Sequence, residues 1–205
     1  MAKSSTKKPK SAAANALELV VTVAVAVGLA LLIQAFIVKP YRIPSGSMIP
    51  TLAIGQRVLT NRLDTHPSLG DVVVFHPPLG AGAERCADPR QGQGSRQACD
   101  TAGREDTTQT YIKRVVGLPG DHISIQNGHV IRNGHLEKAP YAQPCPVPSV
   151  CTFPKTFVVP PGEYFMMGDN RGESDDSRFW GPIPQSWVIG VAFFTYWPPS
   201  RIGTL

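Results

Sequence analysis

The clearest pattern in this 205-residue chain is an apolar segment near its N-terminus. No charged residue occurs between Glu18 and Lys39, and Leu19–Val38 is almost entirely aliphatic. As a helix, this segment spans about 30 Å, the hydrocarbon thickness of a bilayer. A buried core helix is the alternative, but such a helix is rarely apolar on every side. The pattern therefore predicts one transmembrane helix, which we place at residues 16–38.

The segment is also longer than the h-region of a cleaved signal peptide, which has about 7–15 residues. No small-x-small cleavage site follows it, since residues 36–40 read FIVKP. Residues 1–15 form a basic tail, and basic flanks stay in the cytoplasm. We therefore expect a single-pass anchor in the inner or plasma membrane, with residues 40–205 on the outer side.

Beyond the anchor, frequent prolines argue against long helices. Short runs rich in β-branched and aromatic residues lie between them, which favours strands. We expect strands at Arg57–Asn61, Asp71–His76, Tyr111–Val116, His122–Gln126, His129–Arg132, Thr156–Val159, Tyr164–Met167 and Val188–Tyr196. Asn127-Gly128 separates two of these runs and Asn133-Gly134 follows the second, which are strong hairpin signals. The fold class predicted is all-β, an antiparallel sheet domain with long loops.

Two segments, about 77–109 and 140–154, look like insertions, and each contains two cysteines. The pairs are Cys86 and Cys99 in the first segment, and Cys145 and Cys151 in the second. An even number of cysteines in an exported domain suggests disulfides, and four cysteines allow three pairings. We favour the local pairing, because each pair then flanks its own loop. Zinc is the rival, but the usual C-x₂₋₄-C spacing is missing, so we expect no metal.

Charge lies mostly outside the expected domain. The net charge is +5, and Lys3, Lys7, Lys8 and Lys10 contribute +4 of it. The remainder of +1 gives no clustered basic face, so we expect no nucleic-acid partner. The apolar share of 42% is ordinary for a globular protein, but the anchor holds much of it.

The first segment with candidate chemistry is Ile43–Leu52, IPSGSMIPTL. Its small residues allow close backbone approach, and we expect Gly46 to permit an unusual φ beside Ser47. The prolines on both sides stiffen the run, which suits a serine whose hydroxyl must point in one direction. An ordinary loop would look the same in isolation.

A serine nucleophile needs a base, and neither a G-x-S-x-G nor an S-x-x-K motif is present. The run YIKRVVGLPGD, residues 111–121, offers a lysine instead. In a strand, Lys113 shares a face with Tyr111 and Val115. An apolar environment on that face would lower the pKa of the amine by desolvation. An exposed lysine on a half-buried strand is the alternative.

The third segment, MGDNRGESDDSRFWG at residues 167–181, is dense in Asp, Ser and Arg. A polar turn after a strand is the plain interpretation. The other is a hydrogen-bonded network beside a site. There, Arg178 would pair with Asp169 or Asp176, and Ser174 would orient an amine.

Together, and in this order after an anchor, the three segments resemble the motifs of bacterial type I signal peptidases. These are membrane-bound Ser/Lys endopeptidases, also called leader peptidases, and the match runs from Tyr41 to about Trp197. The resemblance implies removal of signal peptides from exported preproteins after small-x-small sites, with no cofactor. The implied partners are preprotein signal peptides and the lipid bilayer, and we expect a monomer.

The resemblance also implies roles for the matched residues. Ser47 would be the nucleophile and Lys113 the general base, while Ser45 and the Ser47 N–H would bind the oxyanion. Ser174 would hydrogen-bond the Lys113 amine. The other supporting residues would be Tyr111, Arg114, Asp169, Asp176 and Arg178.

The two cysteine pairs have different support. Cys145 and Cys151 resemble a disulfide of some family members, whereas the pairing of Cys86 with Cys99 rests on spacing.

Three other functions fit the sequence less well. A relative specialised for conjugation or pilus substrates would tend to shorten the third segment. A non-catalytic anchored β-domain would show broken motifs. A self-cleaving repressor would need a DNA-binding domain where the apolar segment stands.

Overall fold

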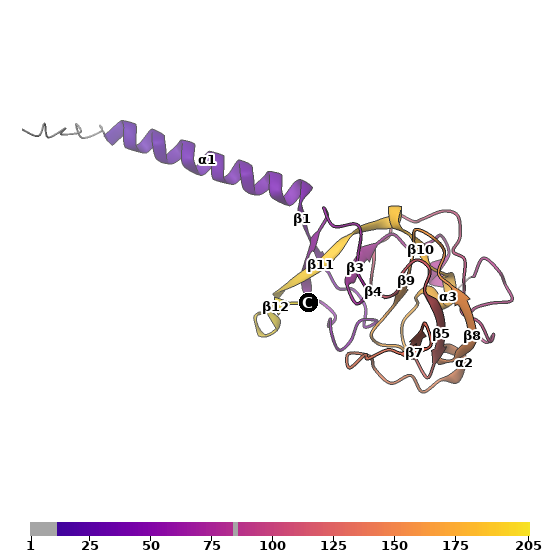
Figure 1. The fold of residues 1–205 in the computed structure, drawn as a ribbon. Coiled ribbons are helices and arrows are strands. Elements are labelled where there is room, and N and C mark those ends of the chain that lie inside the picture. The colour runs from indigo at the N-terminus through magenta and orange to yellow at the C-terminus, as the bar shows by residue number, and fades with distance from the viewer. Residues whose placement is uncertain (1–11, 84–85) are drawn as a thin grey trace, which may run out of the picture. The chain divides into compact units, whose positions relative to one another are not determined.

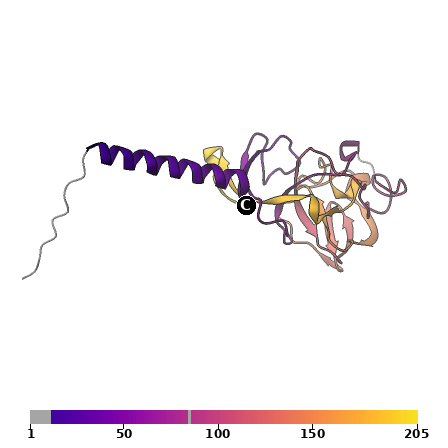
Figure 2. The same cartoon turned by 90° about the horizontal axis from the view of Figure 1, so that it is seen from above.

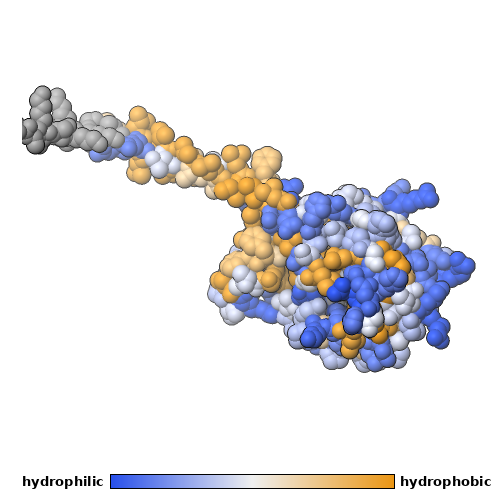
Figure 3. Space-filling model, viewed as in Figure 1, coloured by the Kyte–Doolittle hydropathy of each residue, from blue (hydrophilic) through white to orange (hydrophobic). Residues whose placement is uncertain are grey.

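The computed structural model describes residues 12–83 and 86–205, and the chain divides into two compact units at Val38. Helix α1, Ala12–Phe36, is straight and unbroken (Figures 1 and 2). Its stretch Asn15–Phe36 is long and apolar enough to cross a membrane, and its apolar side chains are exposed (Figure 3). The expected anchor over 16–38 differs at its end, because Val38 begins a strand. The four lysines of the basic tail lie outside the described residues.

Residues after α1 form two antiparallel sheets, which confirms the predicted all-β fold class (Figure 1). The larger sheet has the order β1-β2-β11-β3-β4-β9-β10, with β12 paired to β11, and the smaller has the order β7-β6-β5-β8. The strands are β1 Val38–Arg42, β2 Arg57–Asn61, β3 Val72–Phe75, β4 Tyr111–Gly117, β5 His122–Gln126, β6 His129–Arg132, β7 His135–Leu136, β8 Phe153–Val158, β9 Glu163–Met167, β10 Ile183–Pro184, β11 Val188–Trp197 and β12 Gly203–Thr204. Two short helices, α2 Pro148–Cys151 and α3 Ser177–Trp180, lie in the connections.

All eight predicted strands are present, with small differences at their ends. The largest difference is in β8, which begins at Phe153, three residues before the predicted start. Four further strands, β1, β7, β10 and β12, were not predicted. Three of them have only two residues, and β1 carries a proline, so none shows a readable alternation.

The two Asn-Gly pairs form the hairpin turns that the sequence predicts. Asn127 and Gly128, between β5 and β6, have φ of 51° and 81°, and Asn133 and Gly134, between β6 and β7, have 54° and 81°. Positive φ at both central residues is the requirement of a type I′ turn, which asparagine and glycine tolerate.

Alternation along the central strands separates two apolar cores. On β3, Val73 and Phe75 face the main core, whereas Val72 and Val74 face a smaller one. Strand β4 pairs with β3 in register, so that Lys113 lies opposite Val73 and Ile112 opposite Val74. On the face of β4 that carries Lys113, Val115 belongs to the main core and Tyr111 packs against it. The register therefore places a lysine among core side chains.

An aromatic contact joins the two sheets, and it gives a test of the fold. Phe165 on β9 is fully buried, and its ring centroid lies 5.1 Å from that of Phe157 on β8. We expect Phe165→Ala to lower the free energy of unfolding by about 3–5 kcal/mol, because the cavity adds to the lost burial. Phe193→Ala on β11, where the side chain is 40% exposed, should cost less than about 1 kcal/mol. Urea unfolding in detergent measures both, and equal losses would contradict this packing.

Candidate functional site

Ser47 and Lys113 meet between the β1–β2 loop and the centre of the larger sheet. Lys113 Nζ lies 2.6 Å from Ser47 Oγ, within hydrogen-bond distance. Both residues are buried, with 7% of Ser47 and 4% of Lys113 exposed. The apolar face of β4 brings the lysine to this position, and the loop after β1 brings the serine to it.

Burial has a direct effect on the Lys113 amine. Desolvation lowers the pKa of Lys113 from 10.5 to about 8, and Arg178 acts in the same direction. The carboxylates of Asp176, Asp175 and Asp169 oppose this by favouring the charged form. At pH 7, about a tenth of the molecules then carry the neutral amine, which can accept a proton from a hydroxyl.

The other two serines predicted for the site lie nearby, with different contacts. Ser45 Oγ is 3.4 Å from Ser47 Oγ, and Ser45 is exposed at the surface of the loop. Ser174 is buried, but its hydroxyl has no hydrogen-bond partner in the described part of the chain. The expected bond from Ser174 to Lys113 is therefore not made, since the amine is directed at Ser47 instead.

Gly46 differs from expectation as well, because its φ is not among the positive values of the chain. The space around it is limited on one side. A Cβ at Gly46 would lie 3.2 Å from Ile49 Cδ1.

Asp169 and Arg114 connect the three sequence motifs. Arg114 Nε and Nη2 donate to the two carboxylate oxygens of Asp169 at 2.9 and 2.7 Å. Thr51 Oγ1, from the serine loop, donates to the same carboxylate at 2.5 Å. The serine loop, β4 and the loop after β9 are thereby held together by one buried carboxylate.

Asn170 and Gly168 contact the backbone of Ser47 itself. The Asn170 N–H donates to the Ser47 carbonyl at 3.0 Å, and its side chain donates to the Gly46 carbonyl at 3.2 Å. A Cβ at Gly168 would overlap both Ser174 Oγ and the Ser47 carbonyl oxygen. Sequence reasoning had not singled out Thr51, Asn170 or Gly168, although all three stand inside the quoted motifs.

Of the two predicted partners of Arg178, Asp169 and Asp176, the structure shows Asp176 in the ion pair. Arg178 Nε and Nη2 donate to its carboxylate at 2.8 and 2.9 Å, and the Gly168 N–H donates to it at 3.0 Å. Burial alone would raise the pKa of Asp176, but Arg178 lowers it below its ordinary value. This fully buried ion pair stands at the start of α3, and both of its charges act on the Lys113 amine.

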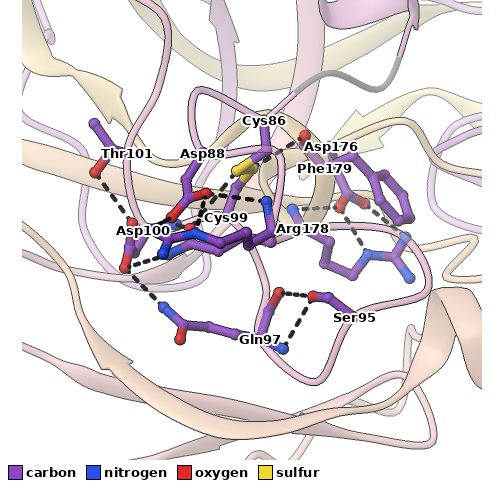
Figure 4. Close-up of a disulfide and its surroundings, with 12 residues drawn as sticks. Cys86, Asp88, Ser95, Gln97, Cys99, Asp100, Thr101, Asp176, Arg178 and Phe179 are labelled. Atoms are coloured by element: carbon purple, nitrogen blue, oxygen red, sulfur yellow. Dashed lines mark hydrogen bonds and ion pairs between the residues drawn. A yellow bond between two sulfur atoms is a disulfide. The ribbon is translucent and has the colours of Figure 1, made fainter.

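Both predicted disulfides are present, Cys86–Cys99 and Cys145–Cys151, and both loops reach Arg178. The Cys99 N–H donates to the Arg178 carbonyl at 3.0 Å, close to the Arg178–Asp176 pair (Figure 4). Arg178 Nη1 donates to the Val150 carbonyl at 2.5 Å, one residue before Cys151. The 77–109 insertion thus packs against the support of the site.

A cleft of about 310 Å³ opens onto Ser47 and Lys113. Its remaining walls come from β1, the loop after it, β3, the start of β4 and the loop after β9. The apolar and aromatic side chains that line it are Tyr41, Ile43, Pro44, Val74, Tyr111 and Ile112. Arg42, Glu173 and Asp175 add charge. The cleft beside Ser47 is therefore mainly apolar, with charged side chains among its walls.

Comparison with known proteins gives consistent matches over most of the chain. The family model described as "Signal peptidase, peptidase S26" matches residues 16–197. The Synechocystis protein named "Probable signal peptidase I-1" is 38% identical over 88% of this chain and 82% of its own length. Signal peptidase IB of Staphylococcus aureus is 31% identical over 90% of this chain and 91% of its own. A solved signal peptidase I from Enterococcus faecalis is 26% identical over 61% of this chain, with a TM-score of 0.39.

The contact between Gly168 and Ser47 gives a test of the site. We expect Gly168→Ala to lower kcat/KM for peptide cleavage about 100-fold, because the added methyl group must displace the serine backbone. Gly172→Ala is the matched control, since its Cβ would lie 3.7 Å from the nearest atom, Pro146 Cδ. A Gly168→Ala variant as active as Gly172→Ala would refute the backbone role of Gly168.

Proposed function

The chain belongs to the signal peptidase family, peptidase S26, whose members remove signal peptides. We propose that Ser47 is the nucleophile of this reaction and that Lys113 is its general base. The observation that carries this proposal is the 2.6 Å distance between Lys113 Nζ and Ser47 Oγ in a buried setting. A lysine can act as a base near neutral pH only when its ammonium form is disfavoured. The pKa of about 8 for Lys113 meets that requirement.

Acylation follows from this arrangement. Neutral Lys113 takes the proton of the Ser47 hydroxyl while Ser47 Oγ attacks the carbonyl carbon of the scissile peptide bond. The charge that forms on the carbonyl oxygen is stabilised by the Ser47 N–H and the Ser45 hydroxyl, at about 3–4 kcal/mol for each donor. The Lys113 ammonium then gives its proton to the leaving amine as the C–N bond breaks.

Deacylation uses the same groups. Lys113 is neutral again after the amine leaves, so it takes a proton from a water molecule that attacks the acyl-Ser47 ester. The new tetrahedral species collapses, the proton returns to Ser47 Oγ, and the signal peptide leaves as a carboxylic acid. Every proton in the two steps passes through the one amine.

The cleft and the anchor support the choice of substrate. Its apolar walls next to Ser47 suit small side chains at the −1 and −3 positions of a preprotein, as in small-x-small sites. Helix α1 holds the protease in the bilayer in which signal peptides are embedded, which raises their effective concentration. A basic tail in the cytoplasm and a catalytic domain on the outer side agree with the two disulfides, which persist in oxidising compartments.

Two substitutions test the assignment of nucleophile and base. Ser47→Ala and Lys113→Met should each lower kcat/KM for preprotein cleavage in detergent by more than about 1,000-fold, because acylation needs both groups. The matched controls are Ser186→Ala and Lys155→Met, which change an exposed serine and an exposed lysine outside the cleft. Substantial cleavage by either Ser47→Ala or Lys113→Met would exclude the Ser/Lys mechanism.

A further inference from the structure

Asp175 is an acidic residue of the cleft that none of the three motif readings uses. It stands in the third segment, between Ser174 and Asp176. Its side chain lines the cleft together with Ser47 and Lys113. A carboxylate in the wall of this largely apolar cleft can affect the charge of the Lys113 amine in the same cleft.

A short chain of contacts connects Asp175 with the catalytic amine. The Tyr111 hydroxyl donates to Asp175 Oδ2 at 3.5 Å, and Lys113 Nζ lies 5.5 Å from the centre of the Tyr111 ring. Tyr111 is itself held on edge against Phe75, with ring centroids 6.4 Å apart. The tyrosine therefore lies between the amine and the carboxylate, with its hydroxyl facing Asp175.

We propose that Asp175 is a positioning residue for the general base, Lys113. The Tyr111 hydroxyl holds the Asp175 carboxylate, and the negative charge of this carboxylate favours the protonated amine of Lys113. As a result, cleavage reaches half of its maximal rate at a higher pH than it would without Asp175. This inference rests on the proposed role of Lys113. The other charges that act on the amine are Asp176, Asp169 and Arg178.

Asp175 differs from the other two carboxylates in its partners. Asp176 forms a buried ion pair with Arg178, and Asp169 forms one with Arg114. Removing either carboxylate leaves a buried guanidinium without its partner, which is strongly destabilising. Asp175 accepts a hydrogen bond from the Tyr111 phenol, and Asp175→Asn keeps the shape of this side chain while removing its charge.

The direction of the effect follows from electrostatics. A nearby negative charge favours an ammonium ion, so Asp175 acts against the desolvation that lowers the pKa of Lys113. Without this charge the amine loses its proton at lower pH, and the neutral base is more abundant in acid. Asp175→Asn should therefore increase activity on the acid side of the profile, which a merely structural role would not do.

The test is the pH profile of kcat/KM for peptide cleavage by the full-length protein in detergent. The acid midpoint is the pH at which kcat/KM falls to half of its maximum on the acid side. We expect that of Asp175→Asn to lie about 0.5–1 pH unit below that of the wild type. Well below the midpoint this corresponds to a rise in kcat/KM of about three- to tenfold. Asp88→Asn is the matched control, because Asp88 pairs with Arg90 in the insertion and does not line the cleft. An unmoved or raised midpoint in Asp175→Asn would overturn the proposal.

A double variant tests the path through Tyr111. If the Tyr111 hydroxyl holds Asp175 in place, Tyr111→Phe should move the midpoint in the same direction, and adding it to Asp175→Asn should give little further change. Fully additive shifts would overturn the positioning by Tyr111. Failure of the catalytic mechanism itself would look different, since Ser47→Ala or Lys113→Met would then remain active at every pH.

Discussion

A lysine amine held out of water beside a serine hydroxyl is the constraint on which the rest of the structure depends. The unfolded chain binds the Lys113 proton with a pKa of 10.5, and the folded chain with a pKa of about 8. Folding is therefore opposed by about 3 kcal/mol below pH 8, because each unit of lowering corresponds to about 1.4 kcal/mol. This cost fades between pH 8 and 10.5, as the folded state releases its proton first. The burial of Lys113 therefore lowers the stability of the fold at the same position at which it makes a neutral amine available.

The surrounding framework holds the two reacting atoms at their short distance. Asp169 gathers the serine loop and β4 through Thr51 and Arg114, and Asn170 holds the carbonyl of Ser47. On the other side, the Asp176–Arg178 pair is fully buried, and the two disulfide loops close over it. These polar contacts and disulfides hold the loops around Ser47 and Lys113 in place.

Much of this organisation could be predicted from the sequence, because it follows local patterns. The central strands alternate clearly, the Asn-Gly pairs mark their turns, and the motifs bring Ser47 and Lys113 into one site. Contacts that depend on the tertiary fold were beyond such reasoning. The choice of Asp176 by Arg178 depends on the turn that begins α3, and the need for glycine at Gly168 depends on how closely the serine loop approaches it. Asp175 carried no sequence signal, since its place in the cleft and its contact with Tyr111 are set by the tertiary fold.

Folding leaves Lys113 with a lowered pKa beside the hydroxyl of Ser47. The most direct measurement is an NMR titration of the protein in detergent with ¹³C-labelled lysine, in which Lys113→Met identifies the signal of Lys113. We expect this signal to titrate near pH 8, well below the ordinary lysine value of 10.5. A Lys113 signal that titrates together with the other lysines would show that folding leaves the pKa of this amine unchanged, which would exclude its role as a base near neutral pH.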